Sequence, residues 1–196
     1  MSSTTSPAED PTTSSAEDRA TSSAEDRASS PAEQLSGALL RRWRIVMVLI
    51  AICGLALDQI VKGLAVAHLD PADPPVLFGG LLRLQLLRNP GAAFSMGSSA
   101  TVVISVFATI ALGVVIGYAA PRCRHRWTLV ACGMVMAGIA GNLTDRLFRA
   151  PGVLRGHVVD LFALPHFAVF NVADMFITAT AVLVVAAMAF GGRGER

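Results

Sequence analysis

The chain has 196 residues, of which 53% are hydrophobic and only 15% are charged, and its mean hydropathy is +0.57. An average soluble domain carries about 25% charged residues, and the apolar residues here come in runs of about 20, so the composition disfavours an ordinary soluble enzyme. The net charge of +2 combines −5 over residues 1–34 with +7 over residues 35–196. Three cysteines without a Cys-x-x-Cys pair argue against a disulfide framework, a redox motif or a zinc ribbon.

The first segment of the chain has low complexity. Ala-Glu recurs at positions 8–9, 16–17, 24–25 and 32–33, a period of 8 residues, among Ser, Thr and Pro. Such a sequence has almost no apolar surface to bury, so it cannot offset the entropy lost on ordering. We therefore expect residues 1–38 to form a disordered acidic tail without a catalytic role.

Four apolar segments follow, each long enough to cross a bilayer core of about 30 Å as a helix. Their ranges are Trp43–Leu69, Ala100–Ala120, Trp127–Phe148 and Phe170–Phe190. Between them, Val76–Met96 has strand character and contains an Asn-Pro-Gly turn, whereas the prolines and glycines of Arg149–Val169 indicate a loop. The sequence predicts an all-α membrane protein over residues 39–192, with four transmembrane helices and a small extracytoplasmic β-sheet segment.

The arginines indicate which way the helices cross the membrane. They form three clusters, namely Arg41, Arg42 and Arg44, then Arg122, Arg124 and Arg126, then Arg193 and Arg196. All three clusters fall on one side of a four-span chain, and cytoplasmic segments carry the excess of positive charge. We expect both termini, including the C-terminal end 193–196, to be cytoplasmic, and the loops 70–99 and 149–169 to face outward.

Four aspartates lie in or beside the apolar segments: Asp58, Asp145, Asp160 and Asp174. A charged side chain at the bilayer centre costs about 2.5–3.5 kcal/mol on insertion scales, so such residues mark function or close pairing. Asp58 and Lys62 are four residues apart on one helix face, which predicts an ion pair. The alternative is that Lys62 extends to the outer interface.

Asp160 and Asp174 are expected near the outer membrane surface, with Asn171 three residues before Asp174. Two carboxylates held close together in a poorly solvated site cannot both ionise readily, so one keeps a proton while the other acts as a base. The base takes a proton from a water that attacks a carbonyl, and the acid protonates the carbonyl oxygen and later the leaving amine. Spacing does not show whether the two aspartates meet, and separate structural roles are the alternative.

Two further polar motifs border the apolar segments. Gly91 permits a turn that other residues resist, and Asn89 offers an amide at the outer surface, although Asn-Pro-Gly also occurs as a plain turn. Asn142 and Arg146 share a helix face at the end of the third segment. Either they point into a cleft and bind a substrate's backbone or headgroup, or Arg146 pairs with a nearby carboxylate in a helix-end cluster.

Together these motifs resemble lipoprotein signal peptidase, the bacterial signal peptidase II family. The matching runs are Asp58-Gln59-x-x-Lys62, Asn89-x-Gly91-Ala92-Ala93-Phe94, Gly141-Asn142-x-x-Asp145-Arg146, Val159-Asp160 and Phe170-Asn171-x-Ala173-Asp174. Each motif alone is loose, but five in this order on a four-span chain are specific. The resemblance covers about residues 42–190.

The resemblance implies a membrane aspartyl endopeptidase of the bacterial inner membrane, inhibited by the cyclic peptide globomycin. Its substrates would be diacylglyceryl-modified prolipoproteins, cut immediately N-terminal to the lipidated cysteine. The catalytic pair maps onto Asp160 and Asp174. The supporting residues map onto Asp58, Lys62, Asn89, Gly91, Asn142, Asp145, Arg146 and Asn171. Met175 departs from the family, which usually has a small hydroxyl residue at that position.

The remaining expectations concern partners and alternatives. We expect a monomer that contacts membrane lipids and no nucleic acid. No metal or organic cofactor is expected, and His157 and His166 lack a recognised ligand spacing. The alternatives are a small proton-coupled carrier that uses the intramembrane carboxylates, and a non-enzymatic assembly factor whose small-residue helix faces bind a partner.

Overall fold

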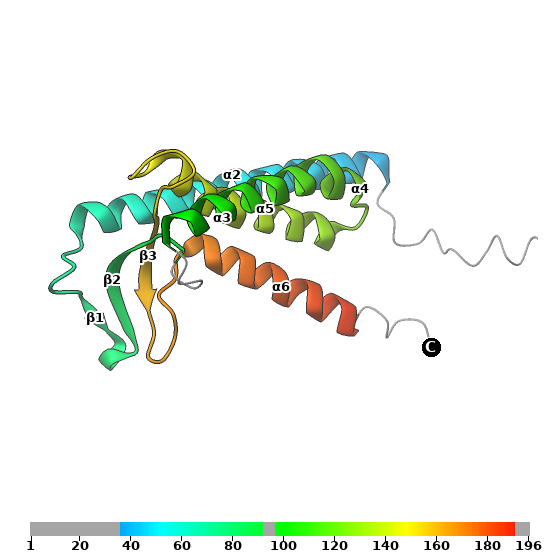
Figure 1. Cartoon of the computed structure of the whole chain (residues 1–196). Helices are drawn as coiled ribbons and strands as arrows, with labels where there is room; N and C mark the ends of the chain where they lie inside the picture. Colours follow the sequence, from blue (N-terminus) through cyan, green and yellow to red (C-terminus); the bar gives the residue numbers. More distant parts are fainter. Residues whose placement is uncertain (1–35, 92–96, 191–196) are drawn as a thin grey trace, which may run out of the picture. The chain divides into compact units, whose positions relative to one another are not determined.

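The structure is a computed structural model that describes residues 36–91 and 97–190. Its helices are α2 (Gly37–His68), α3 (Gly97–Val114), α4 (Ala120–Arg122), α5 (Arg126–Phe148) and α6 (Val172–Phe190), and a π-helical turn at Val115–Ala119 joins α3 to α4 (Figure 1). Within residues 36–91 and 97–190, four helical stretches are long and apolar enough to span a membrane, which agrees with the predicted number of spans. The first begins at Gly37, earlier than the predicted Trp43, so the expectation that the disordered tail extends to residue 38 was wrong for residues 37 and 38, which are helical. The acidic tail up to residue 35, residues 92–96 and the C-terminal end 193–196 lie outside the described residues.

A small sheet lies beside one end of the helices (Figure 1). It contains β1 (Val76–Leu77), β2 (Leu82–Asn89) and β3 (Val158–Ala163), in the order β1-β2-β3 with antiparallel pairing. The strand character predicted from residue 76 onward is therefore present, split by a 3-10 turn at Phe78–Gly80.

The prediction of a loop over residues 149–169 was wrong in its centre, where β3 forms. The prolines that suggested a loop, Pro151 and Pro165, flank the strand and leave its apolar run free to pair with β2. In this pairing Asn89 lies opposite Val158 and Leu87 lies opposite Asp160. The strand therefore carries an aspartate into the sheet beside an asparagine of the neighbouring strand.

Helix α5 is the most buried of these four spans. In its most apolar 18-residue stretch 39% is buried, compared with 6–22% in the corresponding stretches of the other three spans. Glycines on α5 allow the other helices to approach closely. A Cβ added at Gly133 would lie 2.6 Å from the carbonyl oxygen of Met47 in α2, and one at Gly138 would lie 2.6 Å from that of Ala173 in α6. Small residues at helix contacts are typical of membrane bundles.

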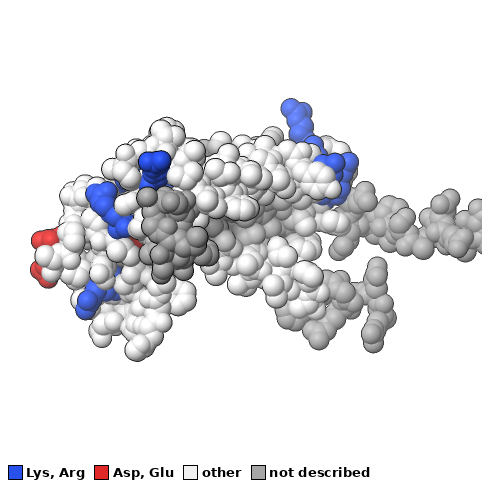
Figure 2. Space-filling view, in the orientation of Figure 1, with Lys and Arg blue, Asp and Glu red and all other residues white. Residues whose placement is uncertain are grey.

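The charged side chains of the visible face gather at its two ends. Figure 2 shows Lys and Arg near the start of α2 and at α4, and again around the sheet, with a largely uncharged surface between. Large apolar side chains such as Ile52, Phe107 and Val182 are exposed along the helices. A soluble monomer rarely exposes so much apolar surface, so this region fits contact with the hydrocarbon core of a membrane.

Candidate active site

Asp160 and Asp174 come from different elements, β3 and the first turn of α6, and Asn171 connects them. The Asn171 Nδ2 donates to Asp160 Oδ1 at 2.6 Å, and the backbone N–H of Asn171 donates to Asp174 Oδ2 at 3.2 Å. In return, the Asp174 N–H donates to Asn171 Oδ1 at 3.1 Å. This reciprocal arrangement is a capping box at the start of α6. The residue that begins the helix therefore holds both carboxylates in one site.

The two carboxylates have unequal surroundings. Asp160 is only 2% exposed, and Asn89 Nδ2 donates to its Oδ2 at 2.9 Å. The pKa of Asp160 lies above its ordinary value, mainly because burial disfavours the charged form. Hydrogen bonds from Asn89 and Asn171 partly oppose this rise in the pKa, and the nearby charge of Asp174 adds to it. Asp174 is only partly buried. Environments that differ in this way favour one protonated and one ionised member of a carboxylate pair.

The Asn-Pro-Gly turn orients the Asn89 amide that donates to Asp160. Asn89 Oδ1 accepts the backbone N–H of Gly91 at 2.8 Å, which leaves its Nδ2 directed at Asp160. Gly91 has a φ of +105°, a conformation that other residues rarely adopt. The turn was expected, and its role in aiming the Asn89 amide is an addition from the structure.

Lys62 is fully buried and donates to three acceptors. Its Nζ lies 2.9 Å from Asp58 Oδ2, 2.9 Å from Asp145 Oδ2 and 3.1 Å from Asn142 Oδ1. This confirms the predicted ion pair with Asp58, and the alternative in which Lys62 reaches the interface is wrong. All three N–H bonds of the ammonium are used, as a buried charge requires.

Asn142 links Lys62 to the aspartate pair. Its Oδ1 accepts from Lys62 Nζ and from Asn171 Nδ2, both at 3.1 Å. Its Nδ2 is therefore directed away from the lysine and donates to Asp174 Oδ1 at 2.8 Å. The structure therefore places Asn142 between Lys62 and the two aspartates.

Two carboxylates beside Lys62 hold the backbone of the elements that carry the pair. Asp58 Oδ1 accepts the N–H of Ala173 at 2.8 Å, next to Asp174. Asp145 Oδ2 accepts the N–H of Val159 at 3.1 Å, next to Asp160. One buried cluster thus fixes both α6 and β3.

The alternative in which Arg146 pairs with a carboxylate is not matched by a salt bridge among the described residues. Its Nη1 donates to the carbonyl oxygen of Asn142 at 3.2 Å, and its charge interacts with those of Asp160, Asp145 and Asp174. Arg149 pairs with a carboxylate instead: its Nε lies 2.5 Å from Asp145 Oδ1. Sequence reasoning missed Arg149, although its spacing of four residues from Asp145 was a usable signal.

Gln59 is a second residue that sequence reasoning did not assign to the site. Its Nε2 donates to the carbonyl oxygen of Gly141 and to Asp58 Oδ2, each at 3.1 Å. The same amide lies 3.4 Å from Asp145 Oδ1. Gln59 therefore joins α2 to α5 beside the buried charges.

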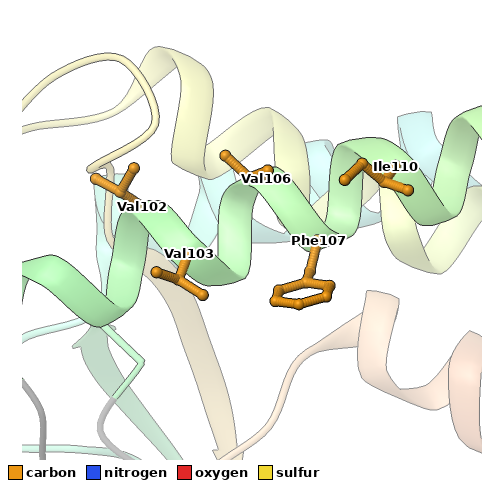
Figure 3. Close-up of a pocket in the computed structure, with 5 residues that line it drawn as sticks. All are labelled: Val102, Val103, Val106, Phe107 and Ile110. Carbon is orange, nitrogen blue, oxygen red and sulfur yellow. The ribbon is translucent and has the colours of Figure 1, made fainter.

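A groove of about 980 Å³ opens beside Asp174. Side chains of α6, of the segment 164–170 and Met134 of α5 line it, and Asp174 is the one ionisable residue among them. Met175, which departs from the expected small hydroxyl residue, is 51% exposed and lines the same groove. A second, smaller hollow of about 190 Å³ lies along α3 and is lined only by aliphatic and aromatic side chains (Figure 3). These surfaces suit an extended, largely apolar ligand.

No cluster of three or more His, Cys, Asp or Glu side chains is placed to hold a metal ion in residues 36–91 and 97–190. His166 is exposed and His157 is partly buried in the loop before β3.

Comparison with known proteins decides the family. The family profile described as signal peptidase (SPase) II matches residues 50–190. The chain belongs to this family. It is 44% identical over 144 residues to the lipoprotein signal peptidase of Rhodococcus jostii (strain RHA1). The aligned region covers 72% of this chain and 71% of that protein. It is also 44% identical over 153 residues to the lipoprotein signal peptidase of Mycobacterium avium (strain 104), with 77% and 82% covered.

Two solved structures of bacterial membrane enzymes share the fold of this signal peptidase II family member. One, determined by the in meso method at 1.9 Å resolution, superposes with a TM-score of 0.65 at 23% identity, covering 80% of this chain and 96% of that one. The other, at 2.3 Å resolution, gives a TM-score of 0.61 at 22% identity, covering 84% and 95%. Family and fold together describe a multi-pass peptidase of the bacterial inner membrane that removes signal peptides from lipoproteins.

Proposed function

We propose that this signal peptidase is an aspartyl endopeptidase in which Asp160 and Asp174 share one proton. The observation that carries the proposal is the position of Asn171, whose side chain and backbone bond to both carboxylates. The different burial of the two aspartates supports a division of labour between acid and base. The carrier and assembly-factor alternatives lose their basis, because the family removes signal peptides.

In the proposed reaction, the raised pKa of Asp160 keeps the shared proton there in the resting enzyme. Ionised Asp174, at the edge of the groove, takes a proton from a water that attacks the scissile carbonyl. Asp160 protonates the carbonyl oxygen as the tetrahedral intermediate forms. The intermediate then collapses and the C–N bond breaks. The proton held by Asp174 passes to the leaving amine, and Asp160 takes back a proton from a hydroxyl of the intermediate as the carboxyl product forms, which restores the shared proton. The positive charge of Arg146 offsets the single negative charge of the pair.

The proposed scissile bond precedes the diacylglyceryl-modified cysteine, so the leaving amine is the amino group of that cysteine. The apolar groove beside Asp174 supports a substrate that stays in the lipid while its peptide bond reaches the aspartates. Four residues are proposed as supporting residues. Asn142 bonds directly to Asp174, whereas Asp58 and Asp145 accept the backbone N–H groups of the residues just before the two aspartates. Lys62 bonds to all three of these side chains.

The ends of α5 support the proposed orientation. Arg126 at its start belongs to a cluster with Arg122 and Arg124, whereas Asn142 near its other end bonds to Asp174. Since positive clusters mark the cytoplasmic side, we place both termini in the cytoplasm and the aspartates near the outer face. We further propose a monomeric peptidase domain over residues 39–192 that acts without a cofactor, preceded by an accessory tail.

The proposal is tested with the purified full chain in detergent and a prolipoprotein prepared with and without diacylglyceryl modification. We expect cleavage of the modified form, with a product whose mass places the cut immediately before the lipidated cysteine. Equal cleavage of the unmodified form, or a cut elsewhere, would contradict the proposed specificity.

A further inference from the structure

Arg149 directly follows α5 as its C-cap residue and forms a close contact with a fully buried carboxylate. Its Nε lies 2.5 Å from Asp145 Oδ1, and its own side chain is 22% exposed. Asp145 is 0% exposed and accepts from Lys62 and from the N–H of Val159 through its other oxygen. Arg149 therefore binds the side of Asp145 that faces away from the lysine.

Arg149 is the second cation in direct contact with this cluster, beside Lys62. Asp58 and Asp145 are both buried and Lys62 neutralises one of them. Without Arg149, one negative charge in this fully buried cluster would lose its directly bound cation. An uncompensated buried charge is costly, so the site would respond by protonating or moving a carboxylate.

Either response would loosen β3. Asp145 Oδ2 accepts the Val159 N–H at 3.1 Å, and the orientation of this carboxylate depends on Lys62 at Oδ2 and on Arg149 at Oδ1, where the Gln59 amide at 3.4 Å is the longer contact. Val159 is fully buried and directly precedes Asp160. A shift of this strand would change the distance between Asp160 and the scissile carbonyl, and a misplacement of about 1 Å can cost about 100-fold in rate.

We propose that Arg149 is a positioning residue for the peptidase reaction, acting through Asp145 and Val159 on the placement of Asp160. This rests on the proposed role of Asp160 as one of the reacting carboxylates. Arg149 does not touch the aspartate pair in the described structure, so its effect is expected in turnover and not in substrate binding.

The test measures kcat and KM for a diacylglyceryl-modified prolipoprotein with the purified full chain. Arg149→Gln should lower kcat about tenfold or more with KM within about twofold of wild type. Arg149→Lys keeps the positive charge and should stay within about threefold of the wild-type kcat. Arg155→Gln is the matched control, because Arg155 is an exposed arginine of the same loop and should leave both constants unchanged.

A double variant tests whether the effect passes through Asp145. In an Asp145→Asn background the partner charge is absent, so adding Arg149→Gln should change kcat by less than about twofold. This variant leaves no unpaired buried carboxylate at position 145, so it keeps the test available if Arg149→Gln alone does not fold.

Wild-type kcat in Arg149→Gln, a loss confined to KM, or a further tenfold loss in the double variant would each overturn the inference. Activity of the wild-type protein is measured in the same series. Cleavage by wild type together with an unaffected Arg149→Gln would therefore reject the positioning role and leave the proposed function standing. Absence of cleavage by wild type would reject the proposed function itself.

Discussion

Replacing Lys62 with methionine is the most direct perturbation of the buried charges that support the site. Methionine has a similar length and no charge, so the change removes the ammonium that lies 2.9 Å from both Asp58 and Asp145. It also removes the donor at 3.1 Å from Asn142 Oδ1, which sets the direction of that amide toward Asp174. Stability and activity should therefore both fall.

The magnitude follows from the burial of all three ionised groups, each of which is 0% exposed. Breaking a buried ion pair by removing one partner costs about 3–5 kcal/mol, because the remaining charge is left uncompensated. For a domain of about 150–250 residues, each kcal/mol shifts Tm by about 2–4 °C, so the expected loss is about 6–20 °C.

The assay is thermal unfolding of the purified chain in detergent micelles, followed by tryptophan fluorescence. Lys62→Met/Asp58→Asn restores the charge balance and should recover at least about half of the lost Tm, because no buried charge then lacks a partner. Arg88→Met, at an exposed arginine of β2, is the control and should shift Tm by less than about 4 °C. A Lys62→Met protein as stable as wild type, or a double variant no more stable than Lys62→Met, would refute the reasoning.

Three further changes test other parts of the site. Gly141→Ala should destabilise the chain by about 1–3 kcal/mol in the same unfolding assay, because the added Cβ would lie 2.6 Å from Asp58 Oδ2. Asn89→Ala removes an N–H donor that lowers the pKa of Asp160, so this pKa should rise further. If the protonated form of Asp160 is the acid, the alkaline limb of the kcat/KM profile should then move to higher pH. Thr178→Trp places a large ring in the groove and should raise KM at least about tenfold.

Each of these changes has a matched comparison. Gly63→Ala is the control for Gly141→Ala, because a Cβ added at Gly63 would meet no atom of another element within 4 Å. An equal loss of stability in Gly63→Ala would contradict the packing argument for Gly141. An alkaline limb that stays in place or moves to lower pH in Asn89→Ala would contradict the assignment of the acid. Ile52→Trp, at an exposed position of α2 away from the groove, should leave KM unchanged, and an equal rise in both tryptophan variants would count against the groove.

The helices could be predicted from the sequence because apolar runs of bilayer length have few other outcomes. The expected end of the third span, at Phe148, coincides with the end of α5. Strand β3 could not be predicted in the same way, because its six residues lie between prolines and form a strand only by pairing with β2. Local composition describes the flanks of such a segment and says little about a partner more than 70 residues away.

The site was predictable as a set of residue types and not as a network. The four-residue spacing of Asp58 and Lys62 indicated their pairing, since both lie on one helix. The third partner, Asp145, comes from another helix, and its contact depends on how α2 packs on α5. The link between the two aspartates depends on Asn171 capping α6, which fixes a turn whose geometry spacing alone does not reveal.

Cleavage of a diacylglyceryl-modified prolipoprotein by Asp160→Asn and Asp174→Asn, beside wild type, tests the aspartyl mechanism most directly. Each change keeps the shape of the side chain and removes its ability to exchange a proton. The account predicts that each variant unfolds at about the temperature of wild type, within about 4 °C, and loses cleavage by at least about 1,000-fold. A folded variant of either kind that retains wild-type turnover would show that this carboxylate is not a catalytic residue.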